Sequence, residues 1–237
     1  LSVLFWGFIV VSSLIAFPIA VVLFLVTAPL DRRRALLHRF TCFWASLYTW
    51  FNPAWRVTIH NRERLFEDGP SVIVANHLSL LDILVMFRLQ SHFKWVSKIE
   101  NFRVPLIGWN MTMCGYIPLQ RGTATSVMAM MRRCDEALQN GSAIVMFPEG
   151  TRSATGRMRS FKPGAFEIAK RNGVPIQPIV LRGTGDALPK RGFVLQGRHE
   201  ISIEVMESVS AEEVATVEPE EMMALVRERI AGALEGD

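Results

Sequence analysis

The sequence predicts an α/β fold, in which a mixed, mostly parallel sheet is flanked by helices and preceded by an N-terminal hydrophobic helical membrane anchor. Two observations lead to this prediction. From residue 53 onward, short β-branched and apolar runs alternate with helical runs, which is typical of sheets with parallel strands. Before that point, residues 2–30 contain no charged side chain. A chain of 237 residues suits one α/β domain plus an anchor.

The apolar run at residues 2–30 exceeds the ~20 residues that a membrane-spanning helix needs. It is also longer than the apolar core of a signal peptide, which has about 7 to 15 residues. Pro18 lies within the run, so a single tilted span and a re-entrant pair of half-helices both fit the pattern. The basic stretch that follows, residues 31–34, is typical of the cytoplasmic side and attracts anionic headgroups.

Residues 35–51 combine aromatic side chains with His38 and Arg39, a mixture expected of a helix at the level of the lipid headgroups. The alternative is a core helix of the following domain. Because Asn52 and Pro53 end this helix, we expect membrane-anchoring helices over residues 1–52 and a separate domain over residues 53–237, on the cytoplasmic side of an inner membrane.

The rest of the chain is divided into strands and helices by its apolar periodicity. We expect seven strands, at residues 55–60, 71–75, 93–96, 115–119, 143–147, 176–181 and 201–206. We expect helices at residues 80–89, 104–113, 123–139 and 164–171, and a last amphipathic helix that begins at Pro219.

Composition narrows the function classes. The pI is near 9.3 with a net charge of +4, yet no stretch combines a basic stripe with stacking aromatics in a nucleic-acid-binding module. The basic charge is therefore better explained by an acidic lipid partner than by nucleic acid. The three cysteines, Cys42, Cys114 and Cys134, have neither metal-ligand spacing nor an even number for disulfides, which agrees with a reducing compartment and a packing role. No metal is expected, because the five histidines form no ligand cluster.

His77 and Asp82 follow the expected strand at residues 71–75, and α/β folds place ligand sites at such carboxyl ends. Residues five apart in a regular helix diverge by ~140°, so the two side chains meet only if His77 lies in the turn before the helix. A carboxylate on one imidazole nitrogen would then leave the other nitrogen free to take a proton from a hydroxyl. The alternative is a structural histidine.

A second polar loop, Phe147-Pro-Glu-Gly-Thr-Arg-Ser153, follows the strand at residues 143–147. Gly150 and Thr151 offer backbone amides and a hydroxyl, and the forked guanidinium of Arg152 can hold a phosphate. Glu149 is acidic and is expected to orient Arg152 or to tie down the loop. The alternative is an ordinary polar turn.

These two loops, Asn76-His77-x-Ser79-x-x-Asp82 and Phe147 to Ser153, resemble the glycerolipid acyltransferase family, and within it the 1-acylglycerol-3-phosphate acyltransferases. Two further blocks, residues 115–121 and 174–179, fit the family's order. The four blocks together cover roughly residues 55–206. Pro118 and Gln120 depart from the aromatic and acidic residues that the family often has there.

The resemblance implies transfer of a fatty acyl group from coenzyme A or acyl carrier protein to the sn-2 hydroxyl of 1-acyl-sn-glycerol-3-phosphate, which forms phosphatidic acid. It implies no cofactor beyond the acyl-donor substrate. By the same resemblance Arg121 and Arg152 would bind the substrate phosphate. Lys98, after the strand at residues 93–96, could add a cation to that pocket, whereas Lys94 is expected to be exposed.

Three alternatives stay open. The acceptor could be another lysolipid, such as lyso-ornithine lipid. A lipid hydrolase would need a serine nucleophile, for which Ser79 is the candidate, but the G-x-S-x-G elbow is absent. A non-catalytic lipid-binding protein would not need His77 and Asp82. The acyl donor, the chain length and the oligomeric state are not fixed by the sequence.

Overall fold

A seven-stranded sheet forms the frame of the computed structural model, which describes residues 2–153, 156–190 and 194–236. Its strands lie in the order β1-β7-β6-β2-β5-β3-β4, and every neighbouring pair is parallel except β6 and β7. The mixed, mostly parallel sheet is therefore confirmed. The strands are β1 (Trp55–His60), β2 (Val72–Ala75), β3 (Phe93–Lys98), β4 (Ile117–Leu119), β5 (Ala143–Met146), β6 (Ile176–Arg182) and β7 (His199–Val205).

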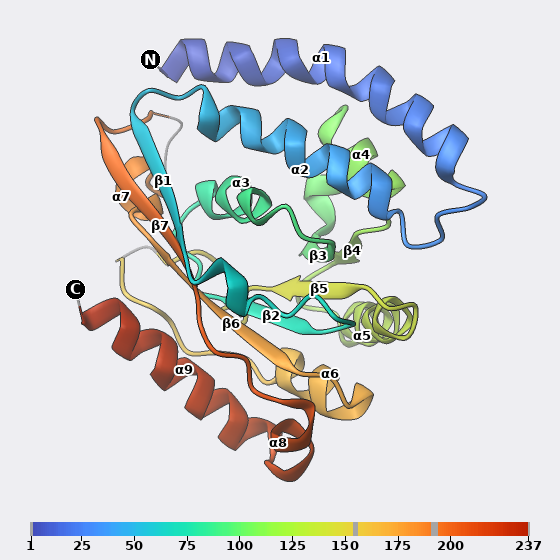
Figure 1. Cartoon of the computed structure of the whole chain (residues 1–237), viewed down its shortest axis with the longest axis vertical. Helices are drawn as coiled ribbons and strands as arrows, with labels where there is room; N and C mark the ends of the chain where they lie inside the picture. The colour runs from blue at the N-terminus through green and yellow to red at the C-terminus, as the bar shows by residue number, and fades with distance from the viewer. Residues whose placement is uncertain (1, 154–155, 191–193, 237) are drawn as a thin grey trace.

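Helices cover both faces of this sheet (Figure 1). On one face lie α1 (Ser2–Thr27), α2 (Ala35–Trp50), α3 (Leu81–Met86) and α4 (Ile107–Met113); against the other lie α5 (Ala124–Gln139), α6 (Gly164–Asn172), α8 (Ala211–Thr216) and α9 (Pro219–Glu235). The short α7 (Thr184–Ala187) and the 3-10 helices η1 (Arg62–Arg64), η2 (Phe87–Leu89) and η3 (Ile99–Arg103) complete the set.

The alternation of side chains along the central strands explains the two-sided covering. In β2, Ile73 and Ala75 belong to one apolar core, with α2 and α3, while Val72 and Val74 belong to the other, with α5, α6 and α9. All four residues are buried. Strands buried on both faces read as continuous apolar runs rather than as alternating ones, which is why β2, β5 and β6 could be identified from sequence.

Some helices and strands begin or end at other residues than the sequence predicted, for reasons that lie in the local backbone. The helix expected from residue 104 begins at Ile107, because Pro105 disfavours a helical conformation in the preceding residue and Leu106 has φ +64°. The strand expected from residue 115 begins at Ile117, since Gly115 lies in a turn with φ +68°. The helix at residues 80–89 ends at Met86 and continues as η2, and α8 was not foreseen.

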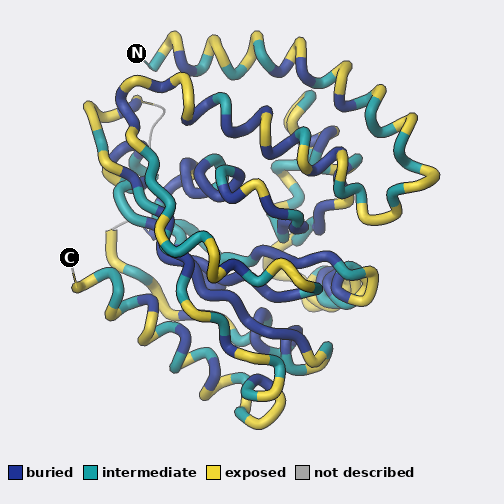
Figure 2. The backbone as a smooth tube through the Cα atoms, viewed as in Figure 1, coloured by how far each residue is buried: buried dark blue, intermediate teal, exposed yellow. Residues whose placement is uncertain are grey.

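α1 is one continuous helix of 26 residues in spite of Pro18, so it is not broken into two half-helices. Among the described residues it is the one helix that is long and apolar enough to cross a membrane. Most of its surface is not covered by the rest of the chain (Figure 2). Its large exposed side chains include Leu4, Val11, Ile15 and Leu25. These features favour association with a membrane.

α2 is more deeply buried than a helix at headgroup level would be. His38, Cys42, Trp44 and Tyr48 are all buried in the core that α2 shares with the sheet. α2 also holds α1, because Ser12 Oγ donates to Tyr48 Oη over 3.1 Å. The alternative of a core helix is therefore correct, although Phe43, Trp50 and Phe51 remain exposed along its outer edge. The division at residue 52 stays a prediction.

Candidate active site

Four neighbouring parallel strands, β2, β5, β3 and β4, end at the same edge of the sheet. The residues singled out from sequence follow these strands in turn: His77 after β2, the loop with Arg152 after β5, Lys98 at the end of β3 and Arg121 after β4. Adjacent strands lie about 4.8 Å apart, so this edge spans roughly 14 Å from β2 to β4. We call it the carboxyl edge.

His77 lies in the turn between β2 and α3, and Asp82 lies in the first turn of α3. Their side chains meet, with His77 Nδ1 2.8 Å from Asp82 Oδ2. Asp82 is fully buried, and the same oxygen accepts the amides of Leu78 and Ser79 at 2.7 and 2.8 Å. Asp82 therefore fixes both the imidazole and the turn that carries it.

The imidazole of His77 is held from a second direction by an aromatic ring. It stacks on Phe147 with 4.0 Å between ring centroids and 9° between planes, and Phe147 stacks in turn on Trp95. The His77 side chain is 13% exposed, and Nε2 has no hydrogen-bond partner within the described ranges. One nitrogen is thus fixed by a carboxylate while the other is open to a ligand, as a general base requires.

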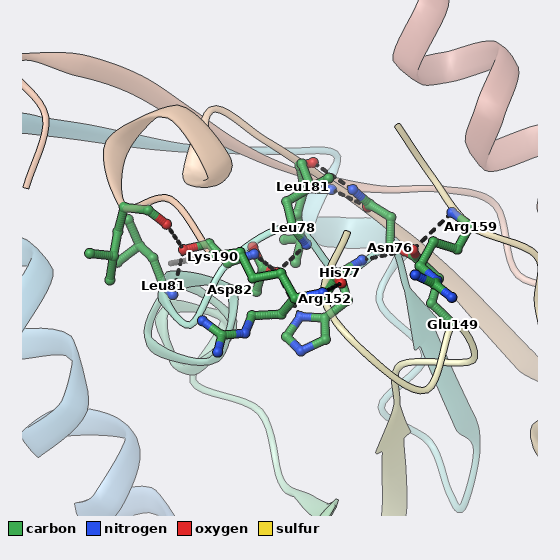
Figure 3. A network of polar contacts seen from close by, with 12 residues as sticks. Asn76, His77, Leu78, Leu81, Asp82, Glu149, Arg152, Arg159, Leu181 and Lys190 are labelled. Atoms are coloured by element: carbon green, nitrogen blue, oxygen red, sulfur yellow. Dashed lines mark hydrogen bonds and ion pairs between the residues drawn. The ribbon is translucent and has the colours of Figure 1, made fainter. Parts of the chain in front are cut away.

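Glu149 ties the two loops together rather than facing a substrate. Its Oε1 accepts the His77 amide at 2.7 Å, and its Oε2 accepts the Arg159 amide at 2.9 Å. Figure 3 shows Asp82 and Glu149 approaching His77 from opposite sides. Burial raises the pKa of the Glu149 carboxyl, and the two amide hydrogen bonds oppose that shift. Of the roles considered from sequence, tying down the loop fits this geometry; direct contact with a substrate does not.

The loop after β5 is bent at Gly150, which has φ +69° and would place a Cβ 3.2 Å from Lys162 Cε. The sequence led us to expect that the Gly150 amide faces a ligand. Instead it donates to the Phe147 carbonyl at 3.0 Å, within the turn. Thr151 and Arg152 are half-buried. The Arg152 guanidinium has no ion-pair partner among the described residues, so its donors are available.

Lys190 was not identified from sequence, yet it supports this loop. Its Nζ donates to the Arg152 carbonyl at 2.7 Å, and both residues appear in Figure 3. The two lie 38 residues apart in the chain, so no local pattern could have found this contact. Arg159, farther along the chain, also supports the loop, since its backbone amide donates to Glu149 Oε2.

Lys98 and Arg121 lie farther along the carboxyl edge. Lys98 is exposed at the end of β3, where it pairs in register with Leu119 of β4, two residues before Arg121. Burial lowers the pKa of the Arg121 guanidinium, and Glu100 partly offsets this effect. The two cations share the edge with His77, but no contact joins them to it.

Ser79 is unsuited to the role of a nucleophile. It is fully buried, its Oγ donates to the Leu188 carbonyl at 2.5 Å, and it accepts the Leu81 amide at 3.1 Å. Ser79 thus links the first residue of α3 to the segment after α7. Within the described ranges, no group of three or more His, Cys, Asp or Glu is placed to hold a metal ion.

Comparison with known proteins adds a family to this geometry. A family model described as Acyltransferase matches residues 56–182, which is more than half of the chain and contains the whole carboxyl edge. The chain belongs to the acyltransferase family. This membership agrees with the resemblance found in the four sequence blocks.

Relatives of this acyltransferase carry a consistent name. A chloroplastic 1-acyl-sn-glycerol-3-phosphate acyltransferase from Arabidopsis thaliana is 42% identical over 158 residues, which are 66% of this chain and 44% of the relative. One from Chlamydomonas reinhardtii is 41% identical over 184 residues, 75% of this chain and 54% of the relative. The chain thus spans about half the length of these relatives.

The fold of this acyltransferase also matches a solved structure. The crystal structure of the 1-acyl-sn-glycerophosphate acyltransferase PlsC from Thermotoga maritima aligns with a TM-score of 0.80, over 99% of this chain and 93% of that one, at 23% identity. The overall architecture is therefore shared, including the helices that precede the sheet.

Proposed function

We propose that this chain transfers a fatty acyl group from a thioester to the sn-2 hydroxyl of 1-acyl-sn-glycerol-3-phosphate, which yields phosphatidic acid. The observation that carries the proposal is the 2.8 Å contact between His77 Nδ1 and Asp82 Oδ2, beside a loop whose Arg152 guanidinium has no ion-pair partner in the part of the chain that the structure describes. The names of the relatives support the same acceptor.

In this mechanism His77 Nε2 removes the proton from the sn-2 hydroxyl while that oxygen attacks the thioester carbonyl carbon. The carbon–sulfur bond breaks, and the thiolate leaves with the proton that His77 had taken. Asp82 stabilises the imidazolium that forms between the two transfers and holds the ring in one orientation. Ser79 Oγ is engaged by the Leu188 carbonyl and the Leu81 amide, so this mechanism uses no ester on Ser79, whereas a serine lipid hydrolase would need one.

The phosphate of the acceptor would be held by Arg152, with Thr151 beside it and with Lys98 and Arg121 farther along the carboxyl edge. A guanidinium can bind phosphate through two parallel hydrogen bonds. Glu149, Gly150 and Lys190 would shape the loop that carries Arg152. No resident metal or cofactor is used. Coenzyme A or acyl carrier protein would bring the acyl group as a substrate.

The exposed apolar side of α1 would lie in the membrane, with residues 31–34 at the headgroups and the carboxyl edge on the cytoplasmic side. The substrate then reaches the site without leaving the bilayer completely.

The test is acyl transfer by the purified full chain in bilayer vesicles, with acyl-CoA and acyl carrier protein as separate donors and lysophosphatidate as acceptor. His77→Ala should lower the rate by at least roughly 10², the typical contribution of a general base. His60→Ala, which alters an exposed histidine on β1, is the matched control. The proposal fails if neither donor gives phosphatidate or if His77→Ala keeps the wild-type rate. Lyso-ornithine lipid as a parallel acceptor tests whether the phosphate is needed.

A further inference from the structure

A separate cavity of about 550 Å³ lies under the turn between α1 and α2. Figure 1 places this turn and α5 on the same side of the molecule. The charged side chains around the cavity come from the turn, β3 and α5, and they are Arg32, Arg33, Arg34, Lys94, Arg133 and Glu136. Five of these six are cationic.

This basic cavity lies toward the other end of the sheet from the carboxyl edge. Lys94 is the second residue of β3, while Gly115 and Ser142, which also line the cavity, precede β4 and β5. Because these strands are parallel, their amino ends lie together, away from His77 and Arg152. The cations of the basic cavity are therefore separate from His77 and Arg152, although its wall extends to η3, where Ile99 and Phe102 follow the carboxyl end of β3.

The cations of the basic cavity are not neutralised by the protein. Among the described residues none of the five forms a salt bridge. Arg33 Nη1 donates to the Gly141 carbonyl at 3.1 Å, Arg34 Nη1 to the Ala28 carbonyl at 2.7 Å, and Lys94 Nζ to the carbonyls of Arg33 and Cys114 at 2.5 Å. The one acid of the lining, Glu136, pairs with Arg132 outside it.

Lys94 is the most constrained of these cations. It was expected to be exposed, but it is buried, with 5% of its surface accessible. Its pKa is lowered to about 8, chiefly by burial and also by Arg34 and Arg33, while Cys114 and Asp31 act in the opposite direction. Two of its three ammonium donors have carbonyl partners, which leaves one for a ligand.

We propose that the basic cavity binds the phosphodiester headgroup of an anionic membrane phospholipid. The cavity combines cations that form no salt bridge within the described ranges with an apolar wall that includes Ile99, Phe102 and Ile117, which suits an amphiphilic ligand. Three of its lining residues, Arg32 to Arg34, follow shortly after α1, whose exposed apolar side chains continue to Val26. A lipid held there would fix the height of the domain relative to the bilayer. This inference does not depend on the proposed acyl transfer.

The test measures lipid retention by the full chain in neutral detergent, with phosphatidylglycerol or phosphatidylcholine counted per protein by mass spectrometry after gel filtration. Wild type should retain phosphatidylglycerol in preference to phosphatidylcholine. Arg33→Gln with Arg133→Gln should weaken that retention at least about tenfold, because charge-assisted contacts to phosphate are lost. Arg56→Gln with Arg64→Gln removes the same charge from the exposed outer surface near β1 and should change nothing.

Three further outcomes decide the matter. Retention in His77→Ala and in Arg152→Gln at the wild-type level places the lipid away from the active site, whereas its loss in Arg152→Gln would overturn the proposal. Displacement by inorganic phosphate at equal concentration would show a site for free phosphate rather than for lipid. Unchanged retention in the Arg33/Arg133 variant, with an unchanged thermal midpoint, would also overturn it.

Discussion

At the carboxyl edge of the sheet buried acids accept hydrogen bonds, whereas the cations of the basic cavity, from buried Lys94 to exposed Arg33, donate within the described ranges only to carbonyl groups. Asp82 and Glu149 together accept five hydrogen bonds from the His77 ring and from four backbone amides. Lys94 and its neighbours have no carboxylate partner of that kind. The acids of the carboxyl edge hold the His77 turn in place, whereas the cations of the basic cavity keep donors for an anionic ligand.

The largest effect at the carboxyl edge is expected for Asp82→Asn. The amide can accept some of the same hydrogen bonds but carries no charge, so the imidazolium loses its stabilising partner. We expect kcat to fall by about 10² or more, with little change in KM. Steady-state kinetics would measure both, with Asp186→Asn, which alters an exposed carboxylate on α7, as the control. A kcat within twofold of wild type would remove Asp82 from the mechanism.

A smaller effect is expected where the carboxyl edge holds a ligand. Arg152→Lys keeps the charge but loses the planar fork that binds phosphate by two bonds. KM for lysophosphatidate should rise roughly tenfold, while kcat stays near wild type. Arg157→Lys, in the exposed segment just beyond, serves as the control. An equal rise in both variants would point to general surface charge and not to a phosphate site.

Glu149→Gln tests whether positioning alone matters at this edge. Glutamine has one acceptor oxygen, so either the His77 amide or the Arg159 amide loses its partner. An unsatisfied buried donor costs about 1–3 kcal/mol, so the thermal midpoint should fall by several degrees and kcat by about tenfold or less. Calorimetry and kinetics on the same sample would measure this, beside exposed Glu207→Gln. A raised KM with unchanged kcat would instead assign Glu149 to substrate contact.

The smallest effect concerns the charges near the basic cavity. Burial lowers the pKa of His92 to about 4, and Lys94 and Arg33 add to the shift. Between pH 6.5 and pH 4 the unfolded chain therefore binds a proton that the folded chain does not, so stability decreases as the pH falls through this window. His92→Gln should lose less of its thermal midpoint over that range than wild type. An identical pH profile, with His60→Gln as control, would exclude this contribution.

Much of the carboxyl edge could be predicted from sequence because its main contact joins residues that are close together in the chain. His77 and Asp82 are five residues apart, and the expected strand, turn and helix brought them together as the 3.6-residue period required. Lys190 and Phe147 could not be assigned their roles in this way. Lys190 reaches Arg152 across 38 residues, and the stacking of Phe147 on His77 depends on β5 lying next to β2.

The basic cavity lay outside what sequence could foresee, and Lys94 is the clearest example. In the sequence it is a single lysine between aromatic residues, and such a residue is normally exposed because burying a charge is costly. The structure buries it because β3 begins beneath the turn of residues 31–34, where the Arg33 carbonyl, together with that of Cys114, accepts hydrogen bonds from the ammonium. Sequence also could not predict the burial of α2. Its aromatic residues indicated a helix at the membrane surface, but in the structure one side of α2 packs into the core.

The sequence by itself determined the alternation of strands and helices, the apolar first helix, and the identity of the residues that follow each central strand. These are properties of short segments, since propensity and periodicity act over a few residues. Only the tertiary structure decided the order of the strands, the inward face of α2, the role of Glu149 and the gathering of five cations at the far end of the sheet. Those features depend on which distant segments are packed together, and burial and charge pairing are set by that packing.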